Sequence, residues 1–499
     1  MKSLEQRRKH ASEIYDQGRE AVINYIVELE IKIEMLDERL KRLEAIIHKD
    51  SHNSSLPPSS DGLNHYPKNS REKSNRSPGG QKGHSGSTLK RSSTPDTVIV
   101  YPVYKCSQCG CSLKKVESTD RDIRQVMDIP PLKLTVTEHQ SESKTCPHCG
   151  TTTQASFPEG ITKAVQYGEN IKTVGVYLMH YQLLTSKRTT EAIEDLFRFK
   201  VANDSVCGVS EGSLFNWAKE LSQGLESSYK SIKEHVISSP VVHFDETGIA
   251  CDTQLHWLHV ACTPDATFLA AHPKRGGVAM DTIGIIPMFK GTAVHDMWAS
   301  YFKYDFKHGI CNAHIIRELT FAFEEYKQLW AQQLRIRSRL RLKELLQKMN
   351  TIVERYCESG KTALNSQTLR RYEKLYDKII SKGLRKNPRL FGRPHKRGRV
   401  KQSKVRNLLD RLRDHRKSVL AFLYDFTIPF TNNLAERDLR MTKVKLKISG
   451  CFRSDDGAER YAHIRSYLST TKKNGVVAFD AISTAFKGNP FTLKPYYAE

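Results

Sequence analysis

The stretch Val241–Gly248 has the sequence VVHFDETG, a short apolar run that ends in acidic side chains. Such a run, rich in β-branched and aromatic residues, is typical of a buried strand, here with Asp245 at its tip. A second stretch, Gly291–Asp296 with the sequence GTAVHD, predicts another strand with Asp296 at its tip. Asn432–Arg437, with the sequence NNLAER, predicts the start of a helix that carries Glu436. We therefore expect the three carboxylates to meet in one acidic site.

Carboxylate oxygens are the ligands that Mg²⁺ and Mn²⁺ prefer. Two such ions, roughly 3.5–4 Å apart, stabilise the attacking and leaving oxygens in phosphoryl transfer. In this arrangement Asp245 would bridge both ions, while Asp296 and Glu436 would each anchor one. The pattern therefore predicts metal-assisted phosphoryl transfer on a nucleic acid.

Each carboxylate also has a purely structural interpretation. Asp245 is followed by Glu246-Thr247-Gly248 and could only cap a turn. Glu436 follows Asn433 by three residues, as in a helix capping box. Three further acidic residues compete for the same roles: Glu246, Asp305 and Asp438.

The chain is strongly basic. Its 499 residues include 79 Lys and Arg against 55 Asp and Glu, a net charge of +24. This surplus favours a polyanionic partner such as DNA, although a solvated surface would also carry it. The charged N-terminus lacks a signal peptide, and no apolar run approaches the roughly 18 residues of a membrane span. We expect a cytoplasmic, nucleoid-associated bacterial protein whose cysteines do not form disulfides.

Residues 20–48 carry an apolar heptad repeat, in which the spacing alternates between four and three residues. The seam consists of Val22, Ile26, Leu29, Ile33, Leu36, Leu40, Leu43 and Ile47. Mostly β-branched residues at one seam position and mostly Leu at the other favour a parallel dimeric coiled coil. An amphipathic helix packed within its own chain is the alternative. We predict a helix and a dimerising coiled coil over residues 1–50.

Residues 51–98 are rich in Ser, Asn, Pro, Gly and Lys and predict a flexible basic linker. Gly79–His84, with the sequence GGQKGH, lacks the Gly-Lys-Ser/Thr ending of a phosphate-binding loop and predicts only a turn.

Residues 99–159 contain two Cys-x-x-Cys-Gly motifs. Their four thiols belong to Cys106, Cys109, Cys146 and Cys149. This spacing predicts a zinc ribbon in which the four cysteines hold one structural zinc ion. Between the motifs, Leu132, Leu134 and Val136 alternate as in a strand. Redox-active or simply buried thiols are the alternatives, and Cys111 and His148 are spare ligands.

Residues 160–235 have helical apolar spacing at 190–197 and 212–221, which suits a DNA-binding helix-turn-helix or a helix pair packed on the core. From residue 240 the pattern predicts strands at 241–244, 256–262 and 267–272, a helix at 278–286 and a strand at 291–294. Three strands, a helix and a strand begin a ribonuclease-H-like fold, which we assign to residues 236–319 and 426–475.

Asp296 and Glu436 are 140 positions apart (436 − 296), which predicts a helical insertion over residues 320–425. Residues 476–499 form a C-terminal element. The insertion carries a basic run of Arg389, Arg393, Lys396, Arg397, Arg399, Lys401, Lys404 and Arg406. We expect this run, chiefly Arg389 to Arg399, to contact DNA phosphates; a solvated helical face is the alternative. The predicted fold class is thus multidomain α+β.

The chain resembles transposases of the insertion sequence 66 family over nearly its whole length. The motifs that carry this resemblance are NSSLPPSSD at 53–61, GGQKGH at 79–84, the four-cysteine module, HFDET at 243–247, HDMWASY at 295–301, NNLAERDLR at 432–440, GA at 457–458 and TKKNG at 471–475.

The resemblance implies a DNA transposase with the catalytic triad Asp245, Asp296 and Glu436. It also implies accessory proteins encoded by the same element. Cys311-Asn312-Ala313-His314 resembles a Cys-x-x-His element that follows the second aspartate in transposases with such insertions, which would place His314 near the active site. A helix residue with an ordinary core role is the alternative for His314. A non-catalytic zinc-ribbon regulator and a nuclease without strand transfer are the competing functions.

Overall fold

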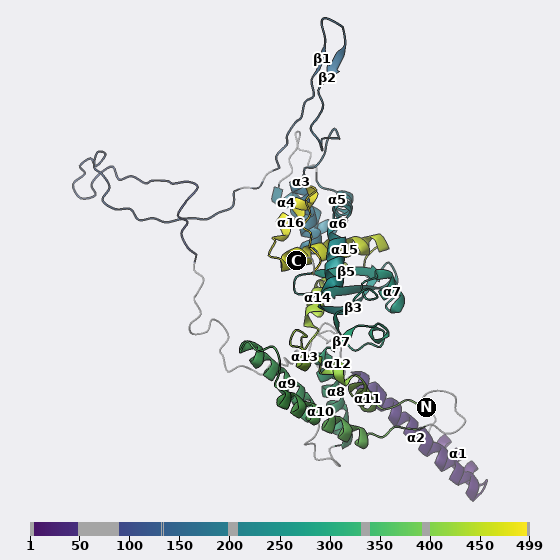
Figure 1. Cartoon of the computed structure of the whole chain (residues 1–499). Helices are drawn as coiled ribbons and strands as arrows, with labels where there is room; N and C mark the ends of the chain where they lie inside the picture. The colour runs from purple at the N-terminus through teal and green to yellow at the C-terminus, as the bar shows by residue number, and fades with distance from the viewer. Residues whose placement is uncertain are drawn as a thin grey trace.

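The computed structural model describes residues 4–47, 89–130, 132, 134–197, 208–330, 340–391 and 400–496. Figure 1 shows a mixed α/β molecule in which helices surround one sheet, and a small hairpin stands apart from it. Within the described ranges, no helix is both long and apolar enough to cross a membrane.

The sheet has five strands in the order β5-β4-β3-β6-β7. Its strands are β3 (Val241–Cys251), β4 (Gln254–Cys262), β5 (Thr267–His272), β6 (Thr292–His295) and β7 (Lys307–Ile310). β3, β4 and β5 form an antiparallel meander, whereas β6 and β7 run parallel to β3. The helix α7 (Gly277–Ile283) lies between β5 and β6 in the chain.

Asp245 is not at the tip of its strand, contrary to the expectation from sequence. β3 continues to Cys251 because its antiparallel partner β4 pairs with it along its whole second half. The parallel ladder with β6 ends earlier, at His243 and Val294. Asp245 therefore lies just beyond the end of the parallel ladder, on a strand that remains supported from its other side.

Helices cover both faces of the sheet. On one face, Leu258 and Leu269 pack with residues of α14 (Asn433–Ser449) and α15 (Asp455–Lys473). On the other face, Phe244 and Phe268 pack with residues of α6 (Glu226–Ser238) and α7. The sheet is thus the middle layer of three.

α15 also protects the exposed edge of the sheet. Its Thr470 and Ser466 hydroxyls accept hydrogen bonds from the backbone N–H groups of Thr267 and Leu269 in β5, at 3.0 and 2.8 Å. An uncovered edge strand offers unpaired N–H groups to other chains, and these side chains satisfy two of them.

A second core joins the region before the sheet to the end of the chain. It contains α3 (Glu169–Val176), a π-helical turn (Tyr177–Tyr181), α4 (Ser186–Phe197), α5 (Glu211–Gly224) and α16 (Ala478–Phe486). Their apolar side chains pack with the C-terminal half of α15. α4 and α5 match the helices expected from sequence, and the residues between them, 198–207, lie outside the described part.

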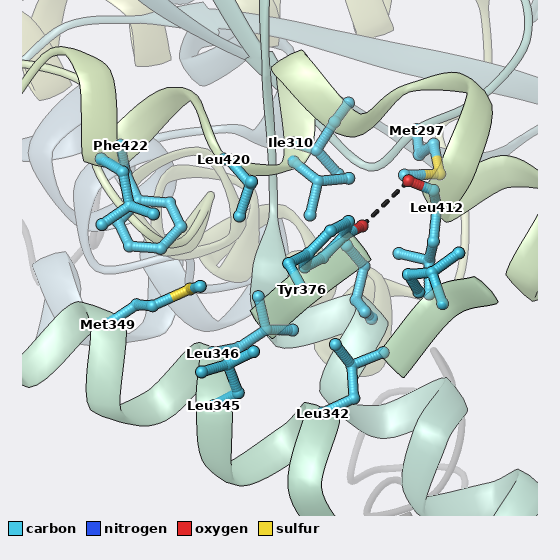
Figure 2. Close-up of a cluster of buried hydrophobic side chains, with 14 of the residues drawn as sticks. Met297, Ile310, Leu342, Leu345, Leu346, Met349, Tyr376, Leu412, Leu420 and Phe422 are labelled. Atoms are coloured by element: carbon cyan, nitrogen blue, oxygen red, sulfur yellow. Dashed lines mark hydrogen bonds between the residues drawn. The ribbon is translucent and has the colours of Figure 1, made fainter. Parts of the chain in front are cut away.

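The chain between β7 and α14 is helical where it is described. Its helices are α8 (Asn312–Trp330), α9 (Leu340–Glu358), α10 (Ser366–Lys386), α11 (Lys404–Asp414), α12 (Arg416–Val419) and α13 (Ala421–Tyr424). Figure 2 shows their shared core, where the Tyr376 hydroxyl donates to the Leu412 carbonyl at 2.9 Å. Met297 and Ile310, from the end of the sheet, belong to the same core. The insertion is therefore anchored next to Asp296.

At the N-terminus, α1 (Leu4–Tyr15) precedes α2 (Arg19–Ile47), a single helix over the predicted heptads. Seam residues Ile33, Leu36 and Leu40 are 64%, 64% and 55% exposed in the single chain. A helix packed against the described residues of its own chain would bury them, so no described part of the chain covers this apolar stripe.

The cysteine-rich region contains one hairpin, β1 (Ser143–Thr145) and β2 (Thr152–Gln154), around the second Cys-x-x-Cys motif. The strand expected from the alternation of Leu132, Leu134 and Val136 is absent from the described residues there. Val136 is 80% exposed, and alternation alone forms no strand without a partner to pair with.

Candidate active site

Asp245 lies on β3, and Asp296 directly follows β6, the neighbouring parallel strand. β3 and β6 pair as 241 with 292, 242 with 293 and 243 with 294. Each pair of partners differs by 51 in residue number. If this register continues for two more residues, Asp245 lies opposite Asp296. The sequence places both aspartates at matching heights because each follows a short buried apolar run in the two paired strands.

Asn432 fixes the start of α14 against β3. Its side-chain amide donates to the Phe244 carbonyl at 2.8 Å, and its Oδ1 lies 2.8 Å from His243 Nδ1. Both contacts are made to the two residues that directly precede Asp245 in β3. Glu436, in the first turn of α14, is one helical turn further on. The capping-box interpretation needs Asn433 as the N-cap, but Asn433 is the first residue of α14 and the N-cap is Asn432, whose side chain makes no capping bond to the helix.

The site concentrates negative charge in a confined place. Burial, with the nearby charges of Glu246 and Asp296, raises the pKa of Asp245 to about 7. One oxygen of Glu436, Oε1, is buried and has no hydrogen-bond partner among the described residues. A crowded carboxylate and a buried carboxylate oxygen without a hydrogen bond are both groups whose charge a divalent cation relieves. These residues fit Mg²⁺ or Mn²⁺.

The competing acidic residues have other partners. Glu246 is buried and accepts from Arg275 Nε at 2.9 Å and from the Tyr301 hydroxyl at 2.7 Å. Asp438 pairs with Lys473 at 2.8 Å. Asp305 is exposed on a loop. Glu246 and Asp438 therefore make structural contacts, and Asp245, Asp296 and Glu436 remain the candidate ligands.

His314 lies at the edge of this site. Its Nε2 is 4.0 Å from Glu436 Oε1, and its charge also acts on Asp245. Burial alone would lower the pKa of His314, but its contact with Cys311 and the charge of Glu436 raise it to about 9. The ligand atoms of Cys311, His314 and Glu436 lie within 4.8 Å of one another. Arg317 is 3.9 Å from the same Glu436 oxygen. His314 thus neighbours two of the three carboxylates.

Met297, directly after Asp296, has a backbone φ of +70°. A non-glycine residue rarely adopts this conformation, which persists only where the surroundings hold it. Here the Met297 side chain is buried in the core of the insertion, and its N–H donates to His295 Nδ1 at 3.2 Å. The turn that presents Asp296 is therefore held by the insertion.

The two cysteine motifs have the same local geometry. Gly110 and Gly150 have φ values of +74° and +69°, and each donates its N–H to the first cysteine of its motif, Cys106 or Cys146. Backbone hydrogen bonds within its own motif, together with the Cys109 thiol, lower the pKa of Cys106, and the contact with the Thr151 side chain, together with further hydrogen bonds, lowers the pKa of Cys149. Among the described residues, the two pairs do not form one four-thiol cluster. Each pair is nevertheless a preformed knuckle of the kind that binds zinc.

The predicted basic run is only partly described. Arg393, Lys396, Arg397 and Arg399 lie outside the described residues. Arg389 pairs with Asp410 at 3.1 Å and is about half exposed. Arg406 is buried against the same carboxylate, so its expected place on a DNA-facing surface is wrong. Its guanidinium also donates to the Asn387 carbonyl, because an unpaired buried charge would be costly.

Sequence reasoning missed two groups that shape the site. Arg275 lies between the rings of Trp257 and Trp298, 4.7 and 4.3 Å from their centroids, while it binds Glu246. Asn432 links α14 to β3. Trp298 and Asn432 lie in the family motifs quoted above, so the sequence did contain a signal for them. No sequence pattern pointed to Arg275.

Three family models match the chain. The transposase IS66 family matches residues 165–460, the zinc-finger binding domain of transposase IS66 matches residues 104–150, and a family of unknown function, DUF6444, matches residues 7–90. A search of curated proteins found no match. Among solved structures, the chain is similar to one titled Drosophila P element transposase strand transfer complex. The TM-score is 0.32 and the identity 10%, over 62% of this chain and 94% of that one.

The first model covers more than half of the 499 residues, including every residue of the acidic site, and the second covers all four predicted zinc ligands. The chain therefore belongs to the IS66 family of transposases, with a zinc-finger domain, and functions as a DNA transposase.

Proposed function

We propose that the chain catalyses metal-dependent DNA cleavage and strand transfer through a DDE site on a ribonuclease-H-like domain. The observation that carries this proposal is the juxtaposition of Asp245 and Asp296 at matching positions of paired parallel strands, with Glu436 in the first turn of a helix tied to β3. The strand order, with three antiparallel strands followed by two parallel ones, supports the fold assignment.

Asp245, Asp296 and Glu436 would hold divalent cations, which supply charge stabilisation for the attacking and leaving oxygens of a phosphodiester. The protein's own groups orient these ligands. The Glu246 N–H donates to Asp245 Oδ1, and the Trp298 N–H donates to Asp296 Oδ1, both at 2.9 Å. His314 and Arg317 place positive charge beside Glu436, where a DNA phosphate would approach.

The test is metal-dependent cleavage of DNA that carries the element's ends. Losing a ligand removes several kcal/mol of charge stabilisation, so Asp245→Asn, Asp296→Asn and Glu436→Gln should each slow cleavage by roughly 10³-fold. Asp305→Asn, which removes an exposed carboxylate from the loop between β6 and β7, is the matched control and should cleave normally. DNA binding should persist in all four variants. Wild-type cleavage by Asp245→Asn would refute the site.

The same assay separates the competing functions. A transposase yields donor DNA joined to target DNA, whereas a nuclease without strand transfer yields only cut ends. A non-catalytic zinc-ribbon regulator yields neither product. Joined products that disappear in Asp245→Asn are the expected result.

The remaining parts of the chain support DNA binding and assembly. In the proposed enzyme, Cys106, Cys109, Cys146 and Cys149 hold one zinc ion, and α2 forms a parallel dimer with a second copy. Chelation should unfold the zinc module, because so small a unit has little core of its own. The substrate implies action at the bacterial nucleoid, and the family resemblance implies accessory proteins from the same element.

A further inference from the structure

A second group of metal-ligating side chains lies away from the acidic site. Cys251 ends β3, His256 is in β4, and Asp455 is the first residue of α15. Asp455 Oδ1 accepts from Cys251 Sγ at 3.3 Å and lies 3.2 Å from His256 Nδ1. The three ligand atoms all lie within 4.8 Å of one another. Cys251 is six residues beyond Asp245, roughly 20 Å along the strand.

Backbone contacts hold these three residues in place. The turn Asp252–Thr253 joins β3 to β4, and Asp252 adopts a φ of +53°. Phe452, three residues before Asp455, donates its N–H to the Ala250 carbonyl at 2.8 Å and accepts from the Asp252 N–H at 2.6 Å. The hairpin and the link between α14 and α15 are thereby fixed to each other, so the donors are assembled before any ion binds.

The donors suit zinc. A thiolate, an imidazole and a carboxylate bind Zn²⁺ at about 2.3, 2.0–2.1 and 2.0–2.2 Å in tetrahedral geometry, which sets neighbouring donors roughly 3.3–3.7 Å apart. The two observed separations, 3.2 and 3.3 Å, lie close to this spacing. Cys251 and His256 are buried, whereas Asp455 faces solvent. Cys451, an exposed thiol, directly precedes Phe452, which forms a β-bridge with Cys251.

We propose that Cys251, His256 and Asp455 form a structural zinc site within the catalytic domain, distinct from the four-cysteine zinc finger. The ion would clamp the β3–β4 hairpin to the segment that connects α14 with α15. β3 carries Asp245 and α14 carries Glu436, so the clamp joins the far ends of two elements that supply the acidic site. The alternative is a hydrogen-bonded cluster in which Asp455 only favours the N-terminus of α15.

The zinc content of the full chain distinguishes the zinc site from the hydrogen-bonded cluster. It is measured on protein purified under reducing conditions without chelators. Asp455→Asn removes a ligand, and Asp456→Asn removes the neighbouring carboxylate from the same first turn of α15, so both variants lose the same helix-dipole contribution. Both retain the zinc finger. The proposal predicts that Asp455→Asn contains about one zinc ion per chain fewer than Asp456→Asn and wild type. Equal zinc content in all three proteins overturns it.

His256→Gln provides a second variant that does not depend on α15. Circular dichroism and a thermal unfolding scan establish that each variant is folded before its zinc is counted. Folded His256→Gln should lack the same equivalent of zinc, and full zinc content in it overturns the site. After chelation, added zinc chloride should raise the Tm of Asp456→Asn by more than that of Asp455→Asn, and equal shifts contradict the proposal. Loss of cleavage in Asp245→Asn tests the catalytic assignment separately.

Discussion

Tyr301 and Tyr304 are three residues apart, and each donates its hydroxyl hydrogen to a carboxylate. Tyr301 binds buried Glu246 at 2.7 Å, whereas Tyr304 binds Asp281 at 2.8 Å near the surface. A hydrogen bond to a charged group contributes about 1.5–3 kcal/mol, and a buried acceptor left without its partner is costly. Tyr301→Phe should therefore lower the free energy of unfolding by about 2 kcal/mol, and Tyr304→Phe by less than about 1 kcal/mol. Urea unfolding at pH 7 measures both, and equal losses would contradict the assigned burial.

His235 and Asp265 form an ion pair whose effect on stability depends on pH. His235 Nε2 lies 2.9 Å from Asp265 Oδ2, which raises the pKa of His235 against the lowering effect of burial. The same contact lowers the pKa of Asp265. The histidine contribution is complete below its unfolded pKa of about 6.5 and disappears as the pH rises through its higher folded pKa. The aspartate contribution is complete above about pH 4 and disappears as the pH falls.

The Tm difference between wild type and Asp265→Asn should therefore be largest between about pH 4 and 6.5 and should shrink toward pH 9. Thermal scans across this range provide the measurement. Asp305→Asn, an exposed carboxylate, is the control, and its Tm difference should stay flat. A difference for Asp265→Asn that grows above pH 7 would show that the pair is not ionic.

The sequence singles out Asp245, Asp296 and Glu436 as candidate ligands because each lies beside a recognisable strand end or helix start. It cannot distinguish Asp245 from its neighbour Glu246. Arg275 and Tyr301 decide that question, and they are 29 and 55 residues away in the chain. Contacts over such distances follow from the fold, and no local pattern encodes them.

At the scale of elements, α2 presents its apolar seam to solvent along most of its length. Replacing Leu29 and Leu36 with Glu should yield monomers by light scattering, because charged side chains at seam positions oppose a coiled coil. Ile31 and Met35 are equally apolar and exposed but lie off the seam. Ile31→Glu with Met35→Glu is the matched control and should remain dimeric. Equal behaviour of the two double variants would argue against a coiled-coil seam.

Short elements were the hardest to predict. β7 was missed because Lys307-His308-Gly309-Ile310 contains few strand-forming residues. It is a strand because β6 pairs with it, and a side chain at Gly309 would come within 2.9 Å of Ile428. β3 was expected to end near Asp245, but its pairing with β4 extends it to Cys251. In both cases a partner strand, rather than local propensity, sets the boundary.

For the whole molecule, α10 offers a basic surface outside the acidic site. An open groove of about 490 Å³ is lined by Ser366, Gln367, Arg370, Arg371, Lys374, Leu375 and Lys378. The buried residues Tyr376 and Ile380 face the core of the insertion instead. If Arg370 and Lys374 contact phosphates, replacing both with Gln should flatten the slope of log affinity against log salt by about 1.8, or 0.9 per contact.

A salt series of DNA-binding titrations measures this slope. Lys230→Gln with Lys487→Gln removes the same charge from exposed positions elsewhere and should leave the slope nearly unchanged. If both double variants change it equally, net charge rather than this surface governs binding.

The order of the three proposed metal ligands along the chain has a consequence for protein synthesis. Asp245 and Asp296 emerge from the ribosome early, whereas Glu436 follows 140 positions after Asp296. On the proposed mechanism, a polypeptide cut short before Asn432 contains the heptad helix, the zinc finger and two of the three carboxylates, but no α14 to complete the site. Such a fragment could still occupy DNA or pair with a complete copy, yet it could not cut. Prematurely terminated translation products would then act as dominant inhibitors that restrain the element's own spread.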